Sequence, residues 1–332
     1  MNTIFVTGGS GFIGLHLVEL LLKNNYKVHV LYRNSAKLEA IDHPNLSLFK
    51  GSLSNLESIE RAARGCDGII HVAGVAKQWA KDPELFNKVN IQGSINVFET
   101  AKKLGIKRVV NTSTAGTIPP SFEEQIPNEN TTRELDYFFE YEASKARVEE
   151  IARDYCSEDL EIITVNPCRV YGPGEIGQSN STVLMMDKYL RGKWKFMPGD
   201  GSQYGSFVYV EDVAQGMLQA LLKGKSGTRY ILGGENANYL SFFEYLKDLG
   251  AVNYKVYAIP LNLISSIAKV SGFLAKQFDI APLMMPGVAR KLFYDWKVDI
   301  SKAQNELDYH PRPLKQGLEQ TYQWWLEQNS KA

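Results

Sequence analysis

Two segments of the chain carry a tyrosine and a lysine four residues apart: YEASK, with Tyr141 and Lys145, and YLRGK, with Tyr189 and Lys193. If a segment is helical, its two side chains lie on one face, close enough to share a ligand. An ammonium near a tyrosine favours the phenolate, so such a pair can exchange protons with a substrate. The same spacing also occurs on ordinary exposed helix faces, so spacing alone does not choose between the two segments.

A glycine-rich loop, TGGSGFIG, follows the first expected strand and opens the first expected helix. Glycines spaced by three residues permit a tight turn, let a pyrophosphate approach the backbone, and leave the first N–H groups of the helix facing the anion. Turns also use glycine, so the prediction depends on the strand–turn–helix context. We predict a dinucleotide phosphate site formed by Gly8, Gly11, Phe12, Ile13 and Gly14.

The residues after the second expected strand indicate which dinucleotide binds. An NAD site usually has a carboxylate there that accepts a hydrogen bond from the ribose 2′-hydroxyl. This chain has LYRNSAK instead, with Arg33 in place of the carboxylate and Lys37 nearby. A guanidinium pairs with a 2′-phosphate and accepts no hydrogen bond. The sequence therefore favours NADP(H), with NAD(H) as the alternative if Arg33 is only a solvated loop residue.

Short apolar or β-branched runs alternate with amphipathic segments over the first half of the chain. The runs are IFV, KVHVLY, LSLFK, GIIHV, RVVNTS and EIITVN, and helical patterns lie between them at 12–23, 55–64 and 83–103 and around YEASK. This alternation predicts βαβ units and an α/β fold with a doubly wound parallel sheet, covered by helices on both faces.

The amino-acid composition changes beyond Pro167, where CRVYGPGEIGQSNS is rich in glycine, proline and serine. SFVYVEDVAQGMLQALLKG then resembles another strand and helix. We therefore predict a Rossmann domain at 1–170 with a return segment at 206–232. A smaller, mainly helical substrate lobe is expected at 171–205 and 233–332.

Composition argues against several functions. Lys+Arg and Asp+Glu both number 37, so no net field attracts nucleic acid. The cysteines, at 66, 156 and 168, are too widely spaced for a disulfide framework, and neither they nor the histidines show metal-ligand spacing. No leader peptide is visible, so we expect a cytoplasmic protein. The longest apolar run, 261–278, is broken by Lys269 and Gly272 and makes a poor membrane span, although an interfacial or lid-like helix stays open.

Several motifs occur in a fixed order: TGGSGFIG, HVAG, NTSTAG, YEASK and NPCRVYGPG. With VNIQGSINV, FVYVEDVAQG and DISKAQNELDYHPRPLKQGL, they make nearly the whole chain resemble the extended short-chain dehydrogenase/reductase superfamily, which includes NAD(P)-dependent epimerases and dehydratases. The chain most resembles the branch of dihydroflavonol reductase-like and 3β-hydroxysteroid dehydrogenase-like proteins. GTRYILGGEN is also similar to bacterial relatives labelled sugar epimerases.

The resemblance implies catalytic roles at three positions. Tyr141 would be the general acid/base, Lys145 would bind the nicotinamide ribose and lower the tyrosine pKa, and Thr114 would contact the substrate oxygen. Where the superfamily often has Ser-Ser-Ala, this chain has TSTA. A threonine hydroxyl can still donate and accept. Ser113 is the second candidate, and either hydroxyl could instead cap the strand end.

Topology separates the two Tyr–Lys pairs. YLRGK follows the sixth strand, and Gly192 weakens the helix that would hold its pair on one face. YEASK lies between the fifth and sixth strands, where a helix can present it beside the nicotinamide. YEASK is therefore predicted to be the catalytic pair.

The resemblance places further residues around the cofactor. His71 is expected to pack at a strand end, and Asn90 to shape the site. Ser52 stands where relatives often have an aspartate that reaches the adenine, which puts that contact in doubt. The expected cofactor contacts beyond the glycine-rich loop are Ser52, Leu53, Ala73, Gly74, Pro167 and Val170.

Two enzyme classes share this apparatus. A ketone reductase or alcohol dehydrogenase consumes its cofactor, whereas a nucleotide-sugar epimerase or dehydratase restores it. Nucleotide-sugar enzymes of the superfamily often carry an arginine just before the FVYV strand, and this chain has Gly205 and Ser206 there. Arg191 and Arg290 could still serve a phosphate.

The second lobe is rich in apolar residues at 261–278 and 283–296, and Trp79 lies in a loop that could overhang the site. Such a lining suits a hydrophobic substrate, although many of these side chains could be core. We expect an NADP(H)-dependent oxidoreductase that interconverts a ketone and a secondary alcohol on a bulky, largely apolar molecule. The alternatives are the sugar epimerase and a cofactor-binding regulator without turnover. The resemblance also implies a homodimer formed through 83–103 and 141–155.

Overall fold

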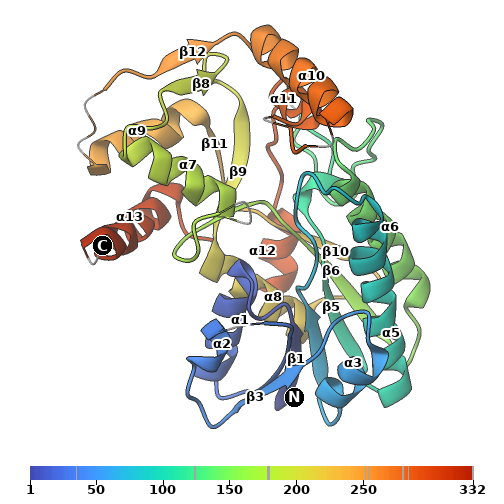
Figure 1. Cartoon of the computed structure of the whole chain (residues 1–332). Coiled ribbons are helices and arrows are strands. Elements are labelled where there is room, and N and C mark those ends of the chain that lie inside the picture. Colours follow the sequence, from blue (N-terminus) through green and yellow to red (C-terminus); the bar gives the residue numbers. More distant parts are fainter. Residues whose placement is uncertain are drawn as a thin grey trace.

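The computed structural model describes all residues except 35, 123–124, 178–179, 251, 253, 279, 283 and 331–332. Within this described part, a parallel sheet of seven strands has the order β10-β6-β5-β4-β1-β2-β3 (Figure 1). The strand order reverses between β1 and β4, which confirms the predicted doubly wound fold. The strands are β1 (Thr3–Thr7), β2 (Lys27–Tyr32), β3 (Leu46–Lys50), β4 (Gly68–His71), β5 (Arg108–Thr112), β6 (Glu161–Pro167) and β10 (Arg229–Leu232).

Helices cover both faces of this sheet, because successive side chains of a strand point to opposite faces. Ile4 and Val6 of β1 pack into one core cluster, under α1, α8 and α12, while Phe5 packs into the other, under α3, α5 and α6. The covering helices are α1 (Phe12–Lys23), α2 (Ala36–Glu39), α3 (Leu56–Ala63), α5 (Gln92–Leu104), α6 (Glu140–Tyr155), α8 (Val210–Lys223) and α12 (Ser301–Leu307).

Two short irregular helices lie next to the sheet. The helical pattern expected at 83–103 begins as α4 (Glu84–Phe86), continues as a π-helical turn, η1 (Asn87–Ile91), and then becomes α5. A 3₁₀ turn, η2 (Ala115–Thr117), follows β5. Both turns lie on the connections that leave the carboxyl ends of β4 and β5, where parallel α/β sheets bind their ligands.

The second lobe is built around small sheets as well as helices. β7 (Arg169–Tyr171), β9 (Tyr204–Tyr209) and β11 (Glu235–Asn238) pair with one another, and β8 (Phe196–Pro198) pairs with β12 (Tyr257–Ile259). The helices of this lobe are α7 (Ser181–Leu190), α9 (Tyr239–Gly250), α10 (Leu261–Phe278), α11 (Pro286–Lys291) and α13 (Leu314–Ser330).

The segment 206–232, predicted as a return to the Rossmann domain, contributes strands to two sheets. β9 pairs with β7 and β11 in the second lobe, whereas α8 packs against α1 and β10 pairs with β6. α12, in a segment assigned to the lobe, contacts α8 and β10. The sequence could not separate these cases, because FVYV reads equally well as a strand of either sheet.

α10 carries an exposed apolar face at one end of the molecule, above α11 (Figure 1). Ile264 and Ala268 pack with Ala289 of α11, while Val270 is 59 % exposed and Phe273 is 68 % exposed. The expectation that the run 261–278 lines the substrate site therefore holds for at most one face of the helix. None of the described helices has the length and apolar character needed to cross a membrane.

Candidate active site

The loop between β1 and α1 has the shape needed to hold a pyrophosphate. Gly8 has φ +74°, and a Cβ there would lie 2.6 Å from the backbone nitrogen of Ala73. A Cβ at Gly14 would lie 2.1 Å from the Gly8 carbonyl oxygen. α1 begins after Gly11, which has no side chain to cap it, so the first N–H groups of the helix remain available to an anion. The predicted loop residues therefore fit a dinucleotide.

The residues expected to select the 2′-phosphate lie on the surface beside β2. Arg33 is exposed directly after the strand. Lys37, on α2, forms an exposed ion pair with Glu175, which contributes little energy in solvent. Arg33 has no ion-pair or hydrogen-bond partner among the residues that the structure describes, so it can meet a phosphate, whereas Lys37 would exchange one anionic partner for another.

The segment after β3 offers less to an adenine than an aspartate would. The Ser52 hydroxyl is 2.9 Å from the Ser54 hydroxyl. Leu53 is buried, and a Cβ at Gly93 would lie 2.9 Å from its Cδ1. Leu53 therefore packs against α5, and the Ser52 hydroxyl is paired with that of Ser54.

Tyr141 and Lys145 lie one turn apart on α6. The helix begins after Phe139, whose backbone is extended, and acidic residues in the first turn suit the positive end of the helix dipole. The Lys145 side chain is buried, and its ammonium donates to the Thr112 carbonyl oxygen at 2.7 Å. α6 thus brings the pair to the carboxyl end of β5.

Burial moves the pKa values of this pair in opposite directions. It raises the pKa of Tyr141 to about 12, although a hydrogen bond with the Thr114 hydroxyl acts against that rise. It lowers the pKa of Lys145 to about 8, against the field of Glu149, which favours the ammonium. Loss of water disfavours the charged form of each group. At pH 7 the pair is therefore a neutral phenol beside a cation, which suits proton donation.

The two hydroxyls after β5 point to different partners. Thr114 Oγ1 accepts from the Gly116 N–H at 3.1 Å, and this hydroxyl is near enough to Tyr141 to act on its pKa. The buried Ser113 hydroxyl donates to Glu149 at 2.5 Å. The structure therefore brings Thr114 to Tyr141, while Ser113 is committed to a carboxylate.

The π-helical turn η1 directs Asn90 into the same region. The Asn90 side-chain oxygen accepts from the Val75 N–H at 2.7 Å, and its amide donates to Ser144 Oγ at 2.9 Å. A Cβ at Gly74 would lie 3.1 Å from Lys145 Nζ and 3.2 Å from Asn90 Oδ1. These contacts fix the segment after β4 against α6, which supports a shaping role for Asn90.

His71 is fully buried at the end of β4 and has partners on both ring nitrogens. Nδ1 lies 2.6 Å from Thr7 Oγ1, and Nε2 lies 3.0 Å from Ser94 Oγ. Burial lowers the pKa of His71 to about 3, with the charge of Lys145 as a second cause. His71 is therefore a neutral imidazole with a hydrogen-bond partner on each ring nitrogen, which fits the packing role expected for it.

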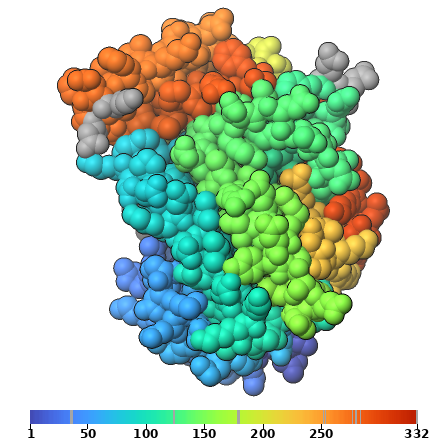
Figure 2. All heavy atoms as spheres, turned by 90° about the vertical axis from the view of Figure 1, so that its right-hand side faces the viewer, coloured from blue at the N-terminus to red at the C-terminus, as the bar shows by residue number. Residues whose placement is uncertain are grey.

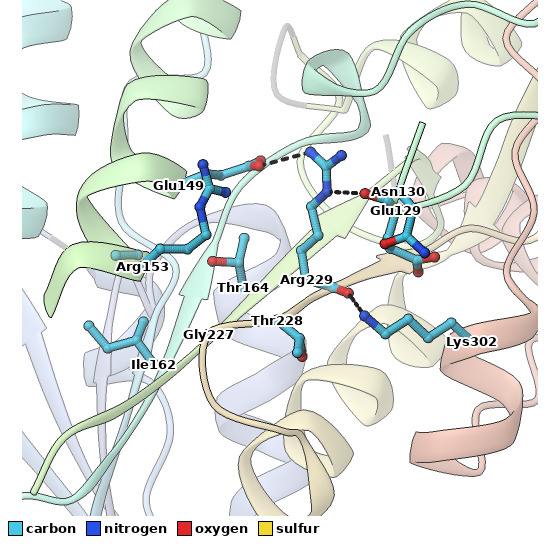
Figure 3. Close-up of a pocket in the computed structure, with 11 residues that line it drawn as sticks. Glu129, Asn130, Glu149, Arg153, Ile162, Thr164, Gly227, Thr228, Arg229 and Lys302 are labelled. Carbon is cyan, nitrogen blue, oxygen red and sulfur yellow. Dashed lines mark hydrogen bonds and ion pairs between the residues drawn. The ribbon is translucent and has the colours of Figure 1, made fainter. Parts of the chain in front are cut away.

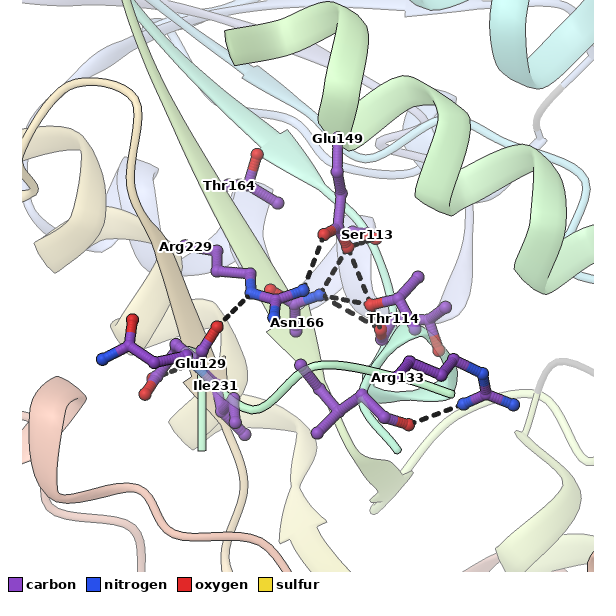
Figure 4. Close-up of polar contacts among 12 residues, drawn as sticks. Ser113, Thr114, Glu129, Arg133, Glu149, Thr164, Asn166, Arg229 and Ile231 are labelled. Carbon is purple, nitrogen blue, oxygen red and sulfur yellow. Dashed lines mark hydrogen bonds and ion pairs between the residues drawn. The ribbon is translucent and has the colours of Figure 1, made fainter. Parts of the chain in front are cut away.

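Glu149, one turn beyond Lys145, lies at the centre of a buried polar network (Figure 4). Its Oε1 accepts from the Asn166 amide at 2.7 Å and from Ser113, and its Oε2 pairs with Arg229 at 3.2 Å. The Asn166 amide also donates to the Thr114 carbonyl oxygen at 3.1 Å. The network joins the ends of β5 and β6 to β10. The four-residue spacing of positions 141, 145 and 149 indicates that Glu149 lies on the same helix face as the Tyr–Lys pair, but the sequence analysis did not use this signal.

Beyond Arg229 the network borders a cavity of about 350 Å³ at the outer edge of the sheet (Figure 3). Arg229 Nε donates to the Glu129 carbonyl oxygen at 2.8 Å, and Lys302 donates to the Arg229 carbonyl oxygen at 3.0 Å. The Glu129 carboxylate accepts from the Ile231 N–H at 2.8 Å, and burial raises its pKa. These groups largely satisfy one another, and the cavity is lined by none of the predicted catalytic or cofactor residues.

A second buried carboxylate joins α6 to the other lobe. Glu142 pairs with Lys291 of α11 and accepts from the Phe138 N–H at 3.1 Å. Burial lowers the pKa of Lys291, while Glu142 acts in the opposite direction. The Lys291 ammonium also lies 4.5 Å from the centroid of the Trp296 ring. Sequence reasoning missed this pair, because its members are far apart in the chain.

The second Tyr–Lys pair is separated by the end of α7. The helix ends at Leu190 and Gly192 has φ +69°, so Lys193 lies outside the helix. Tyr189 is 3 % exposed and its ring packs against Phe243, with centroids 4.8 Å apart. Tyr189 is a core residue of the second lobe.

The parallel sheet, the glycine-rich loop and the Tyr–Lys pair together define a dinucleotide-dependent enzyme of the Rossmann class. The chain belongs to the NAD dependent epimerase/dehydratase family, whose model matches residues 4–233. It is an NAD(P)-dependent oxidoreductase of the extended short-chain dehydrogenase/reductase type.

Curated relatives cover most of the chain. The sequence is 30 % identical to a putative dihydroflavonol 4-reductase of Synechocystis sp., over 98 % of this chain and 94 % of the relative. It is 29 % identical to the decarboxylating sterol-4-alpha-carboxylate 3-dehydrogenase of Mus musculus, over 77 % of this chain and 70 % of the relative.

Solved structures show the same fold. The crystal structure of gox2253 has a TM-score of 0.84 and 26 % identity, covering 99 % of each chain. UDP-glucose 4-epimerase from Thermotoga maritima has a TM-score of 0.80 and 24 % identity, over 98 % of this chain and 99 % of that one. The latter likeness is one of fold alone.

Proposed function

We propose that the protein interconverts a ketone and a secondary alcohol on a bulky, largely apolar substrate, with NADP(H) as cofactor and Tyr141 as general acid/base. The observation that carries the proposal is the grouping at the end of β5, where buried Lys145 donates to the Thr112 carbonyl oxygen and Tyr141 lies one turn away on α6, near the Thr114 hydroxyl. The names of the reductase and sterol dehydrogenase relatives support a large carbon skeleton.

The residues present fit the cofactor. The loop from Gly8 to Gly14 would hold the pyrophosphate, because side chains there would fill the space a close approach needs. Arg33 would pair with the 2′-phosphate, and Lys145 would contact the nicotinamide ribose. When bound, the nicotinamide supplies or accepts the hydride.

The proton follows a short path. In reduction, Tyr141 donates its phenolic proton to the oxygen of the ketone, and in oxidation the phenolate takes the proton of the alcohol. Thr114 holds the substrate oxygen beside that phenol. The Lys145 ammonium offsets the negative charge left on Tyr141. Because burial raises the pKa of Tyr141 to about 12, the phenol is protonated at pH 7 and holds the proton that reduction requires.

A substrate panel tests this function. A flavanone and a 3-ketosteroid are incubated separately with the full chain and NADPH, UDP-glucose is incubated with the chain and NADP⁺, and cofactor absorbance and products are followed. We expect one NADPH oxidised for each alcohol formed from one of the apolar ketones. Interconversion of UDP-glucose without net cofactor change would support the epimerase alternative instead. Cofactor binding without turnover of any panel member would support a regulator.

A further inference from the structure

Arg169 lies where the chain leaves the main sheet for the second lobe. It is two residues beyond Pro167, the last residue of β6, and it begins β7, where it pairs with Phe207 of β9. Its neighbour Val170 is an expected nicotinamide contact. Arg169 therefore stands at the junction of the proposed cofactor and substrate regions.

The guanidinium of Arg169 is held in a fixed position by aromatic groups. Its Nη1 donates to the Tyr239 hydroxyl at 2.7 Å. Its Cζ lies 5.2 Å from the centroid of the Tyr239 ring and 5.5 Å from that of Phe207, within the range of cation–π attraction. Arginine held in this way loses less conformational freedom when it binds a ligand.

Gly205 makes room for this side chain. A Cβ at Gly205 would lie 2.6 Å from Arg169 Nε and 2.7 Å from its Cζ, closer than any side chain allows. The guanidinium therefore occupies the space directly over Gly205.

Arg169 has no carboxylate partner among the residues that the structure describes. Its side chain is only partly exposed. A cation withdrawn from water normally has an anionic or hydrogen-bonding partner for most of its N–H groups, and a tyrosine hydroxyl engages only one of five. The remaining N–H groups are available to a ligand.

The neighbouring cations do not compete for that ligand. Lys291, whose pKa the charge of Arg169 helps to lower, is paired with Glu142. Arg133, which acts on Lys291 in the same way, donates to the backbone oxygens of Ile118 and Gly116. The local field is thus positive, and Arg169, unlike Lys291, has no carboxylate partner in the described part of the chain.

We propose that Arg169 binds an anionic group of the substrate, a carboxylate or a phosphate ester, at a distance from the carbonyl that Tyr141 protonates. This inference rests on the proposed function and narrows its substrate class to bulky apolar ketones or alcohols that carry one acidic group. Both anions accept two parallel hydrogen bonds from a guanidinium fork. The neutral ester of the same substrate cannot form that pair.

Matched probes test the proposal by binding and by turnover. The probes are 4-acetylbenzoate, its methyl ester, and 4-acetylphenyl phosphate, titrated calorimetrically into the full chain saturated with NADP⁺. Turnover of each is then measured with NADPH. We expect the wild-type chain to bind at least one of the two anions about 10- to 100-fold more tightly than the ester, the size of a charged hydrogen-bonded pair. The tighter of the two anions identifies the acidic group.

Variants assign that preference to one residue. Arg169→Gln is expected to remove the preference for the anion while changing affinity for the ester less than about threefold. Arg169→Lys keeps the charge without the fork and is expected to retain part of the preference. Arg290→Gln is the matched control, because Arg290 also lies over an aromatic ring, 5.2 Å from the Phe138 centroid. Melting temperatures report whether each variant is folded.

The outcomes separate this inference from the proposed function. Equal affinity of the wild-type chain for anions and ester would overturn the inference, even if the ester is reduced. An anion preference that Arg290→Gln removes and Arg169→Gln keeps would also overturn it. An anion preference that depends on Arg169, without turnover of any ketone, would support the anion site and contradict the reductase.

Discussion

The chain contains two tyrosine–lysine pairs with the same spacing, and the structure gives them opposite surroundings. Tyr141 and Lys145 share α6 and meet the ends of β5 and β4. Tyr189 lies on α7, while Lys193 lies past the helix end at Gly192. The spacing of four residues is thus a property of both segments, but a shared helical face is a property of one.

The chemistry of a Tyr–Lys pair is therefore determined by the groups around it and not by the spacing of the pair. Around Tyr141 lie polar partners, namely the Thr114 hydroxyl, the Lys145 ammonium and, further along α6, Glu149. Around Tyr189 lie aromatic rings, with the Tyr254 centroid 5.4 Å away and that of Phe243 4.8 Å away. The first setting can stabilise a charge during reaction, whereas the second favours a permanently neutral phenol.

Replacing each of the two lysines by methionine is expected to give the largest difference in kcat/KM between the two pairs. Lys145→Met should lower kcat/KM by about 10²- to 10⁴-fold, because both the ribose contact and the cation beside Tyr141 are lost. Lys193→Met should leave turnover within about twofold of the wild-type value, since surface changes rarely perturb a distant site. Steady-state kinetics with the ketone found in the panel measures both. Equal losses would place the lysine function outside YEASK.

The two hydroxyls after β5 provide the next test. Thr114→Val removes the hydroxyl near Tyr141 and should lower kcat by about 10- to 100-fold. Ser113→Ala removes a donor from buried Glu149 and should lower stability by about 1–3 kcal/mol with a smaller loss of kcat. Kinetics and thermal unfolding of both variants are compared. A larger loss of kcat in Ser113→Ala would reassign the substrate hydroxyl.

The cofactor preference is expected to respond to Arg33. Arg33→Asp replaces a cation by a carboxylate that repels a 2′-phosphate and accepts from a 2′-hydroxyl, so the NADP/NAD ratio of kcat/KM should fall by about 10- to 100-fold. Lys37→Gln is the control, since Lys37 is already paired with Glu175, and a smaller change is expected. An unchanged ratio in Arg33→Asp would show that Arg33 does not read the 2′-phosphate.

The smallest expected effect is on the pH dependence of kcat/KM. The pKa of Lys145 is lowered by burial to about 8, and Glu149 acts against that decrease. kcat/KM should therefore fall as pH rises through about 8 and the ammonium is lost. Glu149→Gln removes the opposing charge, so this alkaline limb should move to lower pH. Glu150→Gln, at an exposed neighbour paired with Arg147, should leave the limb in place. A limb unmoved by Glu149→Gln would contradict the coupling.

The same shift affects stability with a defined sign. The folded-state pKa of Lys145 lies below its ordinary value of 10.5, so unfolding takes up a proton above about pH 8. This residue therefore makes the free energy of unfolding rise with pH between about 8 and 10.5. Denaturant unfolding across that window should show a smaller rise in Lys145→Met than in the wild-type chain.

Much of the fold could be predicted from local sequence. The strand and helix patterns before residue 167 and the glycine-rich loop depend on contacts between neighbours in the chain, which periodicity and turn chemistry report. The position of β9 in the second sheet could not be predicted, because strand pairing is set by partners distant in sequence. The alternation of inward-facing and outward-facing residues along β9 would be the same in either sheet.

The candidate site divides in the same way. Tyr141, Lys145 and Thr114 come together as their motifs predict. Two ion pairs join residues that are far apart in the sequence: Glu149 and Arg229 are 80 positions apart, and Glu142 and Lys291 are 149 positions apart. No local sequence pattern indicates either pair. The contact of Arg169 with Tyr239 is equally remote. Such groups are found only when the fold brings them together.

The most direct measurement compares Tyr141→Phe with Tyr189→Phe in single-turnover reduction of the ketone, with NADPH affinity measured separately. The account predicts that Tyr141→Phe lowers the hydride-transfer rate by about 10²- to 10⁴-fold with cofactor affinity nearly unchanged. Tyr189→Phe keeps the ring and its packing, so the rate should stay near that of the wild-type chain. Undiminished turnover in Tyr141→Phe would contradict the assignment of YEASK as the proton-transfer centre.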